Sequence, residues 1–159
     1  GIGIINKELD YLKDKKVNNL NVLGFNQVAT YSFNYFQKRG GGHFVNISSV
    51  ASEIGNGLAT SYNASKAFQA NYLQGLRFKA YKLKLPIFLT DVRPGFVDTD
   101  ILMGNKDKLF WVAPLDKACY QIMNGIKSKK KILYITKRWK IISLLIKLLP
   151  ENILRLFFR

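Results

Sequence analysis

Long stretches in which apolar residues recur at helical spacing alternate along the chain with short, mostly apolar runs. Apolar residues at helical spacing predict long helices at 14–38 and 61–82, and a run of three glycines ends the first of them. Runs rich in Val, Ile and Phe predict buried strands at 43–48 and 86–92. The order helix, strand, helix, strand favours a parallel sheet with crossover helices.

The second half of the chain continues this alternation. Residues 100–114 are apolar without a clear period, 114–126 are expected to form a helix, and 131–136 a third short strand. From Arg138 onward large apolar residues again fall at helical spacing, and Pro150 divides this stretch into two segments. The whole pattern predicts an α/β fold with a parallel sheet and crossover helices.

The size of the chain suits one domain. It has 159 residues, of which 48% are hydrophobic, so we expect a single domain over 1–159 with a sizeable core. Residues 138–159 are expected to form a basic amphipathic end segment of that domain. The sequence begins at Gly1 without a methionine, and residues 1–10 indicate the exit of a strand into a loop. We therefore expect the sheet to be incomplete at its N-terminus.

Few residues can serve as redox groups or metal ligands. Cys119 is the only cysteine and His43 the only histidine, which excludes an internal disulfide and leaves no cluster with metal-ligand spacing. We expect neither a signal peptide nor a spanning helix, because no apolar run has the required length and flanks. A reducing compartment fits best, and we expect a cytoplasmic protein that holds no metal.

Positive charge gathers at the end of the chain. The formal net charge is +15, and residues 127–159 contain ten Lys or Arg against one acid, Glu151. Such an excess fits nucleic acid, an anionic membrane surface or a merely solvated face. Within 139–159, Pro150 separates two apolar pieces, each too short to span a bilayer of about 30 Å. Either this segment lies peripherally on a membrane, the inner membrane surface in a bacterium, or it packs on the sheet or a partner subunit.

A candidate proton-transfer site lies at the start of the second helix. Tyr62 and Lys66 are four residues apart, so they project from one face, roughly 5 to 6 Å apart at their Cβ atoms. A free phenol has a pKa of about 10, and a nearby ammonium group favours its ionised form. The pair can therefore donate and accept a proton. An isolated pair of this spacing is more often an ordinary tyrosine and a solvated lysine, so the neighbouring residues decide.

Other candidate residues lie at strand ends and inside the first helix. Ser49 follows the first predicted strand and precedes the tyrosine by thirteen residues, and Pro94 and Gly95 follow the second strand. Ligands of open parallel sheets bind beyond the carboxyl ends of the strands. Asn21 and Gly24 stand in mid-helix, where both residue types lower helix propensity. Function or, for Gly24, a packing contact accounts for their presence there.

Four motifs taken in order resemble the classical short-chain dehydrogenase/reductase family, over roughly residues 1–136. They are Asn21-Val22-Leu23-Gly24, Val45-Asn46-Ile47-Ser48-Ser49, Tyr62-Asn63-Ala64-Ser65-Lys66 and Pro94-Gly95-Phe96-Val97-Asp98-Thr99. The family also carries a glycine-rich phosphate-binding loop, followed by an Asn-Asn-Ala-Gly motif whose last glycine Gly1 resembles. The phosphate-binding loop is not among these 159 residues.

The resemblance implies a role for each matching residue. Tyr62 would be the general acid and base, and Lys66 would favour its phenolate and hold the nicotinamide ribose. Ser49, preferred to Ser48 on spacing, would bind the substrate oxygen together with Tyr62. Asn21 would hold a water that links Lys66 to solvent. The residues expected to line the nicotinamide are Pro94, Gly95, Val97 and Thr99.

The resemblance also implies a Rossmann-like parallel sheet, an activity and an assembly. The expected protein is an NAD(P)-dependent oxidoreductase that interconverts an alcohol and a carbonyl by hydride transfer, with NAD or NADP as cofactor and no specific nucleic-acid partner. It would form a homodimer or homotetramer through its two long helices, with Phe68, Tyr72 and Leu76 as candidate interface residues. The apolar segment 101–111 favours an apolar small-molecule substrate. The competing hypothesis is an inactive remnant of the fold that binds a membrane surface or nucleic acid through its basic end.

Overall fold

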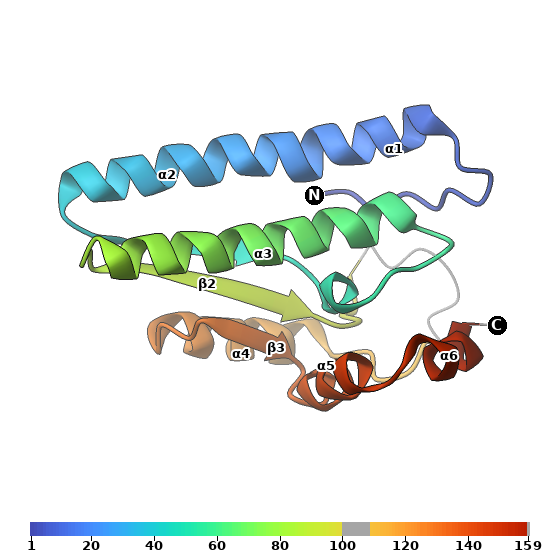
Figure 1. The fold of residues 1–159 in the computed structure, drawn as a ribbon. Helices are drawn as coiled ribbons and strands as arrows, with labels where there is room; N and C mark the ends of the chain where they lie inside the picture. The colour runs from blue at the N-terminus through green and yellow to red at the C-terminus, as the bar shows by residue number, and fades with distance from the viewer. Residues whose placement is uncertain (100–108, 159) are drawn as a thin grey trace.

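The computed structural model describes residues 1–99 and 109–158, so most of the apolar segment predicted at 100–114 lies outside the described residues. After an N-terminal segment at 1–10, the chain forms one continuous helical rod of α1, a π turn and α2, and then alternates strands and helices (Figure 1). The elements are α1 Tyr11–Asn18, the π turn Asn19–Gly24, α2 Phe25–Arg39, β1 Gly42–Ile47, a 3-10 turn Val50–Glu53, α3 Thr60–Lys82, β2 Ile87–Pro94, α4 Leu115–Lys127, β3 Ile132–Ile135, α5 Arg138–Leu148, α6 Glu151–Leu154 and a final 3-10 turn Arg155–Phe158.

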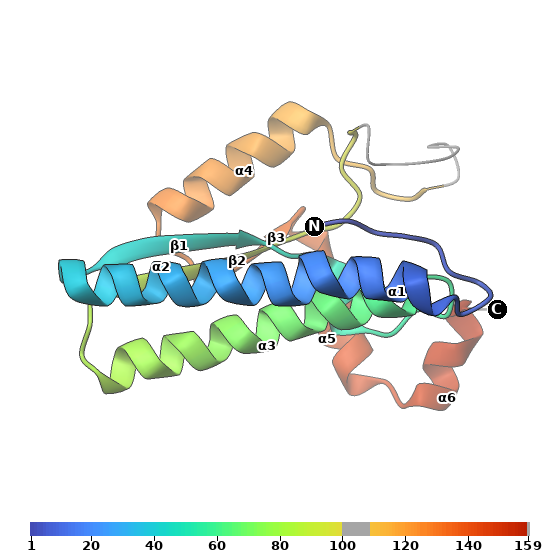
Figure 2. The same cartoon turned by 90° about the horizontal axis from the view of Figure 1, so that it is seen from above.

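The three strands form a parallel sheet in the order β1-β2-β3. Ile47 of β1 lies opposite Val92 of β2, and Pro94 of β2 lies opposite Ile135 of β3. The rod and α3 run side by side along one face of the sheet, while α4 lies on its other side (Figure 2). The predicted α/β fold with crossover helices is confirmed, and all the predicted helices and strands that lie in the described residues are present.

Alternate residues of the central strand serve two separate cores. Ile87 and Leu89 pack with residues of α2 and α3, while Val92 packs with residues of α4 and β3. Both sets are buried, as expected for a strand that is covered on each face. The first core also contains Phe33, Leu73 and Ala80, and the second contains Ala118, Leu133 and Ile135. The central strand is thereby fixed between two helical layers, and its carboxyl end is held in place.

The helix boundaries follow from local chemistry. Asp10 begins α1, since its carboxylate accepts a hydrogen bond from the Leu12 N–H at 2.8 Å. Gly40 ends α2 in the left-handed conformation, with φ 85°, and its N–H bonds back to the last turn of the helix. The glycine run therefore stops the first helix as predicted. The 3-10 turn at Val50–Glu53 was expected only as a loop.

The C-terminal helix α5 is docked on the rest of the domain by one face. Trp139 and Ser143 are buried, and Lys147 forms an ion pair with the buried Glu53 at 3.0 Å. These three residues are four apart, so they share one side of the helix. No helix within the described parts of the chain is long and apolar enough to cross a membrane.

Candidate active site

Tyr62 and Lys66 lie together at the start of α3. The ammonium nitrogen of Lys66 is 5.8 Å from the centroid of the Tyr62 ring. The same nitrogen donates a hydrogen bond to the carbonyl of Ile47, the last residue of β1, at 3.1 Å. The helix face that carries the pair is therefore tied to the carboxyl end of a parallel strand, where ligands of such sheets bind.

Lys66 is a charged group in a poorly solvated place. Its side chain is buried, and desolvation lowers the pKa of Lys66 to about 8, although the nearby charge of Asp91 acts in the opposite direction. At neutral pH most of the lysine is still protonated. A positive charge is thus held close to the phenol ring of Tyr62.

Asn21 stands in the π turn of the rod and binds the N-terminal segment. Its side chain accepts from the N–H of Ile2 at 2.9 Å and donates to the carbonyl of Ile2 at 2.8 Å. It also donates to the hydroxyl of Ser65 at 3.0 Å, and Ser65 donates to the carbonyl of Tyr62 at 2.7 Å. The asparagine therefore links the rod, the N-terminal segment and the turn of α3 that carries the tyrosine.

The N-terminal glycines pass close to these residues. A Cβ atom on Gly1 would lie 2.5 Å from Oδ1 of Asn21 and 3.4 Å from Nζ of Lys66, and one on Gly3 would lie 3.3 Å from the Tyr62 ring. Only a residue without a side chain allows the first of these approaches. Backbone at Gly1–Gly3 therefore forms part of the wall around the tyrosine and lysine.

The two serines after β1 have different surroundings. Ser48 is buried, and its hydroxyl donates to the Asp91 carboxylate at 2.5 Å. Ser49 caps the following 3-10 turn, where its oxygen accepts from the Ala51 N–H at 3.1 Å. Among the described residues nothing accepts the hydroxyl proton of Ser49, so it can be donated to a ligand. Ser49, preferred to Ser48 on spacing, stays a prediction as the serine that binds the substrate oxygen.

The residues expected to line a nicotinamide lie at the same end of the sheet. Ser49 and Pro94 each lie two residues beyond the paired Ile47 and Val92. Gly95 donates its N–H to Ile135 at 2.6 Å, Val97 forms a bridge with Ala113, and the Thr99 hydroxyl donates to the Val97 carbonyl at 3.3 Å. The indole of Trp139 packs directly against Gly95, where a side chain would overlap it. The expected residues therefore share the sheet edge with Ser49.

The sequence model of one family matches this chain. The family is described as short chain dehydrogenase, and the match covers residues 3–109, which is more than half of the chain. The chain belongs to the short-chain dehydrogenase family. Human 17-beta-hydroxysteroid dehydrogenase 13 is 26% identical over 134 residues, which are 84% of this chain and 45% of that protein.

Solved structures of other family members share the fold of this short-chain dehydrogenase. The enzyme from Sphingobium yanoikuyae, in complex with NADPH, matches 90% of this chain and 58% of its own at 20% identity, with a TM-score of 0.74. The enzyme from Burkholderia cenocepacia J2315, in complex with NADP, matches 91% and 60% at 18% identity, also with a TM-score of 0.74. The chain thus spans about half of these relatives.

A buried charged cluster next to Ser49 was not predicted from the sequence. Arg93 on β2 pairs with Asp91 at 2.6 Å and with Glu53, which lies in the 3-10 turn that Ser49 caps. Glu53 also accepts from the Tyr134 hydroxyl at 2.7 Å and pairs with Lys147. The cluster fastens the turn after Ser49 to β2, β3 and α5. These contacts give Arg93 a structural role in the cluster.

Gln69 is a second residue that sequence reasoning missed. Its side chain is 3% exposed and lies one helical turn beyond Lys66 on α3. The amide oxygen accepts from Nζ of Lys66 at 3.3 Å, and the amide nitrogen donates to the carbonyl of Asn21 at 2.8 Å. A glutamine three residues after a lysine gives no signal in sequence, because only the fold brings Asn21 to it.

Proposed function

We propose that this short-chain dehydrogenase is an NAD(P)-dependent oxidoreductase that interconverts an alcohol and a carbonyl compound. The observation that carries the proposal is the joint placement of Tyr62, Lys66 and Asn21, with Ser49 at the adjacent strand end. Family membership supports an oxidoreductase. An inactive remnant of the fold would have no need to keep a buried lysine beside a tyrosine.

Each residue has a defined part in the proposed reaction. Tyr62 gives its hydroxyl proton to the substrate oxygen during reduction and takes it back during oxidation. The ammonium of Lys66 stabilises the phenolate that remains. The hydroxyl of Ser49 donates to the same substrate oxygen, where negative charge develops in the transition state.

The residues present fit a nicotinamide cofactor. The Lys66 ammonium has three N–H donors, and two of them bind Ile47 and Gln69 within the described part of the chain, so one remains for a ribose hydroxyl. Pro94, Gly95, Val97 and Thr99 would line the nicotinamide from the sheet edge. When bound, the cofactor supplies or accepts the hydride. The similar structures named above were solved with NADPH and NADP, which supports NAD or NADP here.

An apolar alcohol or carbonyl is the proposed substrate class. The curated relative is named as a hydroxysteroid dehydrogenase, and a similar structure from Comamonas testosteroni is named as a bulky-bulky ketone specific alcohol dehydrogenase. The latter is 20% identical and has a TM-score of 0.69. In this chain Phe110 and Trp111 contact each other and Trp139, with ring centroids 5.4 to 6.0 Å apart. This aromatic group beside Gly95 favours an apolar ligand.

Turnover by a tyrosine variant tests the proposed reaction. In the full-length gene product, Tyr62→Phe should keep the fold and abolish reduction of a panel of apolar ketones with NADPH or NADH, because only the proton-donating hydroxyl is removed. A Phe variant that reduces any good substrate as fast as wild type would show that Tyr62 has another role. Failure of the wild type on every ketone and alcohol tested would favour the inactive remnant.

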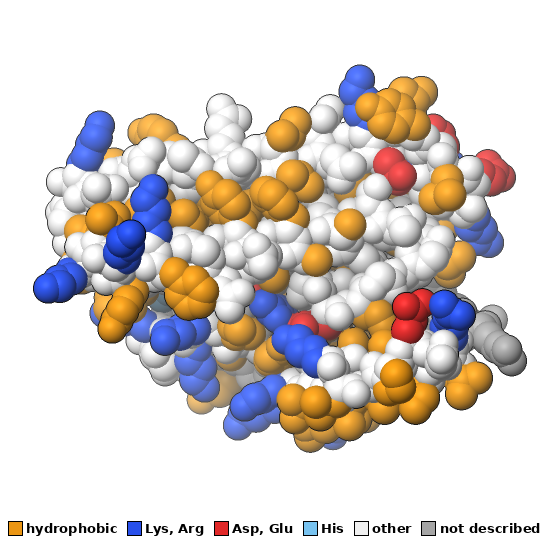
Figure 3. All heavy atoms as spheres, viewed as in Figure 1, with side chains coloured by type: hydrophobic (Ala, Val, Ile, Leu, Met, Phe, Trp, Pro, Cys, Tyr) orange, Lys and Arg blue, Asp and Glu red, His pale blue; other side chains and the backbone are white. Residues whose placement is uncertain are grey.

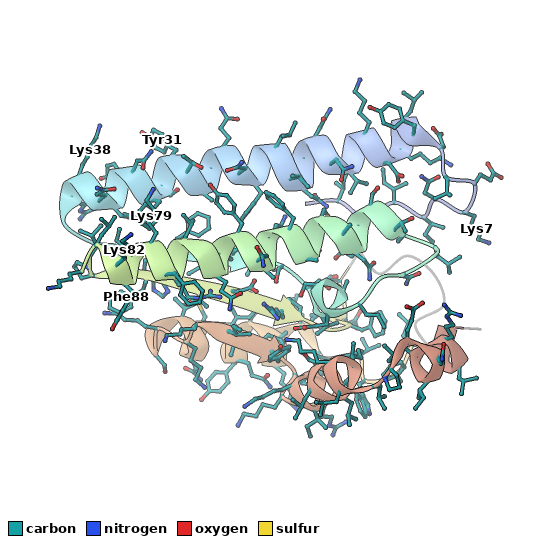
Figure 4. The ribbon with its side chains drawn as sticks, in the orientation of Figure 1. Lys7, Tyr31, Lys38, Lys79, Lys82 and Phe88 are labelled. Atoms are coloured by element: carbon teal, nitrogen blue, oxygen red, sulfur yellow. The ribbon has the colours of Figure 1, made fainter. Side chains whose placement is uncertain are left out.

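A second copy of the chain is the proposed partner of the helical rod. Its outer side exposes a row of large apolar residues, among which Tyr31 points away from α3 (Figure 4). The row comprises Leu20, Leu23, Val28, Tyr31 and Tyr35. By contrast, Phe68 and Tyr72 are half-buried against Phe25 of the same chain, at centroid distances of 6.4 and 5.8 Å. We propose a homodimer or homotetramer through the rod, and sedimentation at micromolar concentration as a monomer would contradict it.

Peripheral contact with an anionic membrane is proposed for the C-terminal helices. The side of α5 opposite its docked face exposes Ile141, Leu144 and Leu148 at 65%, 59% and 71%. Figure 3 shows the apolar side chains gathered over α5 and α6, with basic side chains beside them. Lys137, Arg138 and Lys140 are exposed at the start of α5, and each such residue contributes roughly 1 kcal/mol near an anionic surface. One face of α5 thus packs on the core, and the opposite face is the one proposed to contact a membrane.

Vesicle binding distinguishes a membrane from another protein surface. The protein should co-sediment with phosphatidylserine-containing vesicles at low salt, and much less at high salt or with neutral vesicles. Replacing Ile141, Leu144 and Leu148 by serine should abolish binding, while serine at the exposed Phe78 and Tyr81 of α3 should not. Binding that survives the triple substitution would reject this surface. Loss of self-association in the triple variant would assign the face to a second copy.

A further inference from the structure

One buried amide joins the two groups on which the proposed proton transfer depends. Gln69 accepts from the Lys66 ammonium with its oxygen and donates to the backbone carbonyl of Asn21 with its nitrogen. Asn46 of β1 donates to the same oxygen at 3.3 Å and fixes the orientation of the amide. The amide is thus held from the rod, the sheet and its own helix.

We propose that Gln69 is a positioning residue, which holds the Lys66 ammonium beside Tyr62 by bridging it to the π turn at Asn21. The proposal rests on the proposed function, because it assigns Gln69 its part in that reaction. Gln69 acts through Lys66 and need not touch the substrate.

A neutral amide suits this position better than an acid or an apolar residue. Both groups that accept from Lys66, the Ile47 carbonyl and the Gln69 oxygen, are uncharged dipoles, so they hold the cation without neutralising it. A carboxylate there would cancel the charge that favours the phenolate. An apolar side chain would leave the Asn21 carbonyl and the Asn46 amide without this partner inside the protein.

Two titratable side chains lie near Lys66 in the described part of the chain. Tyr62 precedes it on α3, and Asp91 acts on it from β2. Gln69 is an uncharged group that contacts the ammonium from the same helix. The family resemblance gives Asn21 the task of holding a water for proton exchange. In this chain Gln69 occupies one acceptor site of the Asn21 carbonyl and connects it to Lys66 through a protein side chain.

Two substitutions with opposite effects test the proposal. Gln69→Met keeps the length of the side chain but removes the acceptor, whereas Gln69→Glu keeps the acceptor and adds a negative charge. The methionine should lower the pKa of Lys66 by about one unit from its value of about 8, and the glutamate should raise it. Loss of a merely structural contact would not shift the Lys66 pKa in opposite directions in the two variants. Gln74→Met, an exposed glutamine on the same helix, is the matched control.

The Lys66 titration can be measured without turnover. NMR of lysine labelled at Cε in the full-length gene product gives the titration, and the signal that disappears in Lys66→Arg assigns it. Unfolding curves confirm that each variant is folded. An unchanged Lys66 midpoint in Gln69→Met, or shifts of the same sign in both variants, would overturn the proposal.

Turnover then links the titration to the reaction. If the Lys66 pKa falls by one unit from about 8, the protonated fraction at pH 8 falls about fivefold and that at pH 6 hardly changes. Gln69→Met should therefore lose about fivefold in kcat at pH 8 and little at pH 6, with KM nearly unchanged. An equal loss at both pH values would overturn the positioning role. Shifted titrations in a protein with no turnover in any variant would reject the proposed function and leave the Gln69 contact in place.

Discussion

Replacement of Arg93 by methionine removes the cation from a cluster that is almost fully buried. The side chains of Arg93, Asp91 and Glu53 are 7%, 0% and 3% exposed in their ion pairs. Breaking a buried ion pair by removing one partner costs about 3 to 5 kcal/mol, because the remaining charge has lost its compensation. Asp91 still accepts from Ser48, and Glu53 still accepts from Tyr134. We therefore expect a loss of about 3 kcal/mol, at the lower end of that range.

The loss is measured by urea unfolding at pH 7, followed by far-UV circular dichroism and tryptophan fluorescence. Lys147→Met is the matched control, because it removes a cation from the same Glu53 carboxylate but one that is 56% exposed. Exposed ion pairs contribute below about 1 kcal/mol, so the control should unfold close to wild type. A loss below 1 kcal/mol in Arg93→Met, or an equal loss in the control, would refute the argument that burial makes this pair costly to break.

The cost of Arg93→Met should also depend on pH. Burial alone would raise the pKa of Glu53, but hydrogen bonds from Tyr134 and Lys147 and the charge of Arg93 together hold this pKa below its usual 4.5. A lowered folded pKa gives stability that is fully present above pH 4.5 and is lost as the pH falls through the folded value. Without Arg93 that contribution is smaller. The difference between wild type and Arg93→Met should therefore be largest near pH 7 and shrink toward pH 4.

Two further substitutions test contacts at the sheet edge and in the rod. Gly95→Ala should cost about 1 to 3 kcal/mol in urea unfolding, because the new methyl overlaps the Trp139 indole, whereas Gly55→Ala, with open space around it, should not. Asn21→Ala should lower the melting temperature and speed amide exchange at Ile2, whose N–H and carbonyl both bind the asparagine side chain. Unchanged exchange at Ile2 would contradict that second assignment.

The parts of the site that lie close together in sequence were predictable. A tyrosine and a lysine four residues apart meet on any α-helix, and strand ends of a parallel sheet meet at one edge whatever the register. The order of elements followed from hydrophobic period alone. The parallel order of the strands likewise indicated which end of the sheet carries the candidate site.

The contacts that span long separations were not predictable. Arg93 meets Glu53 across 40 positions, and Gln69 meets Asn21 across 48. The first contact depends on which face of β2 carries Arg93, and the second depends on how the rod is turned about its axis. If the strand slipped by one residue, or the rod turned by one residue, neighbouring residues would make these contacts instead. Sequence period alone fixes a face only approximately, so such pairs become visible only in the folded chain.

The π turn decides how the rod is turned. Val17 and Phe33 are both buried, at 1% and 3%, yet in an unbroken α-helix residues 16 apart point about 160° away from each other. One extra residue in a π turn shifts the second half back by about 100°, which brings the two onto nearly the same side. The same shift leaves Leu20 and Val28 exposed at 50% and 59%, although both fit the helical spacing in the sequence. Asn21 lies inside this turn, so the residue that costs helix propensity stands where the helix must widen for both of its halves to face the core.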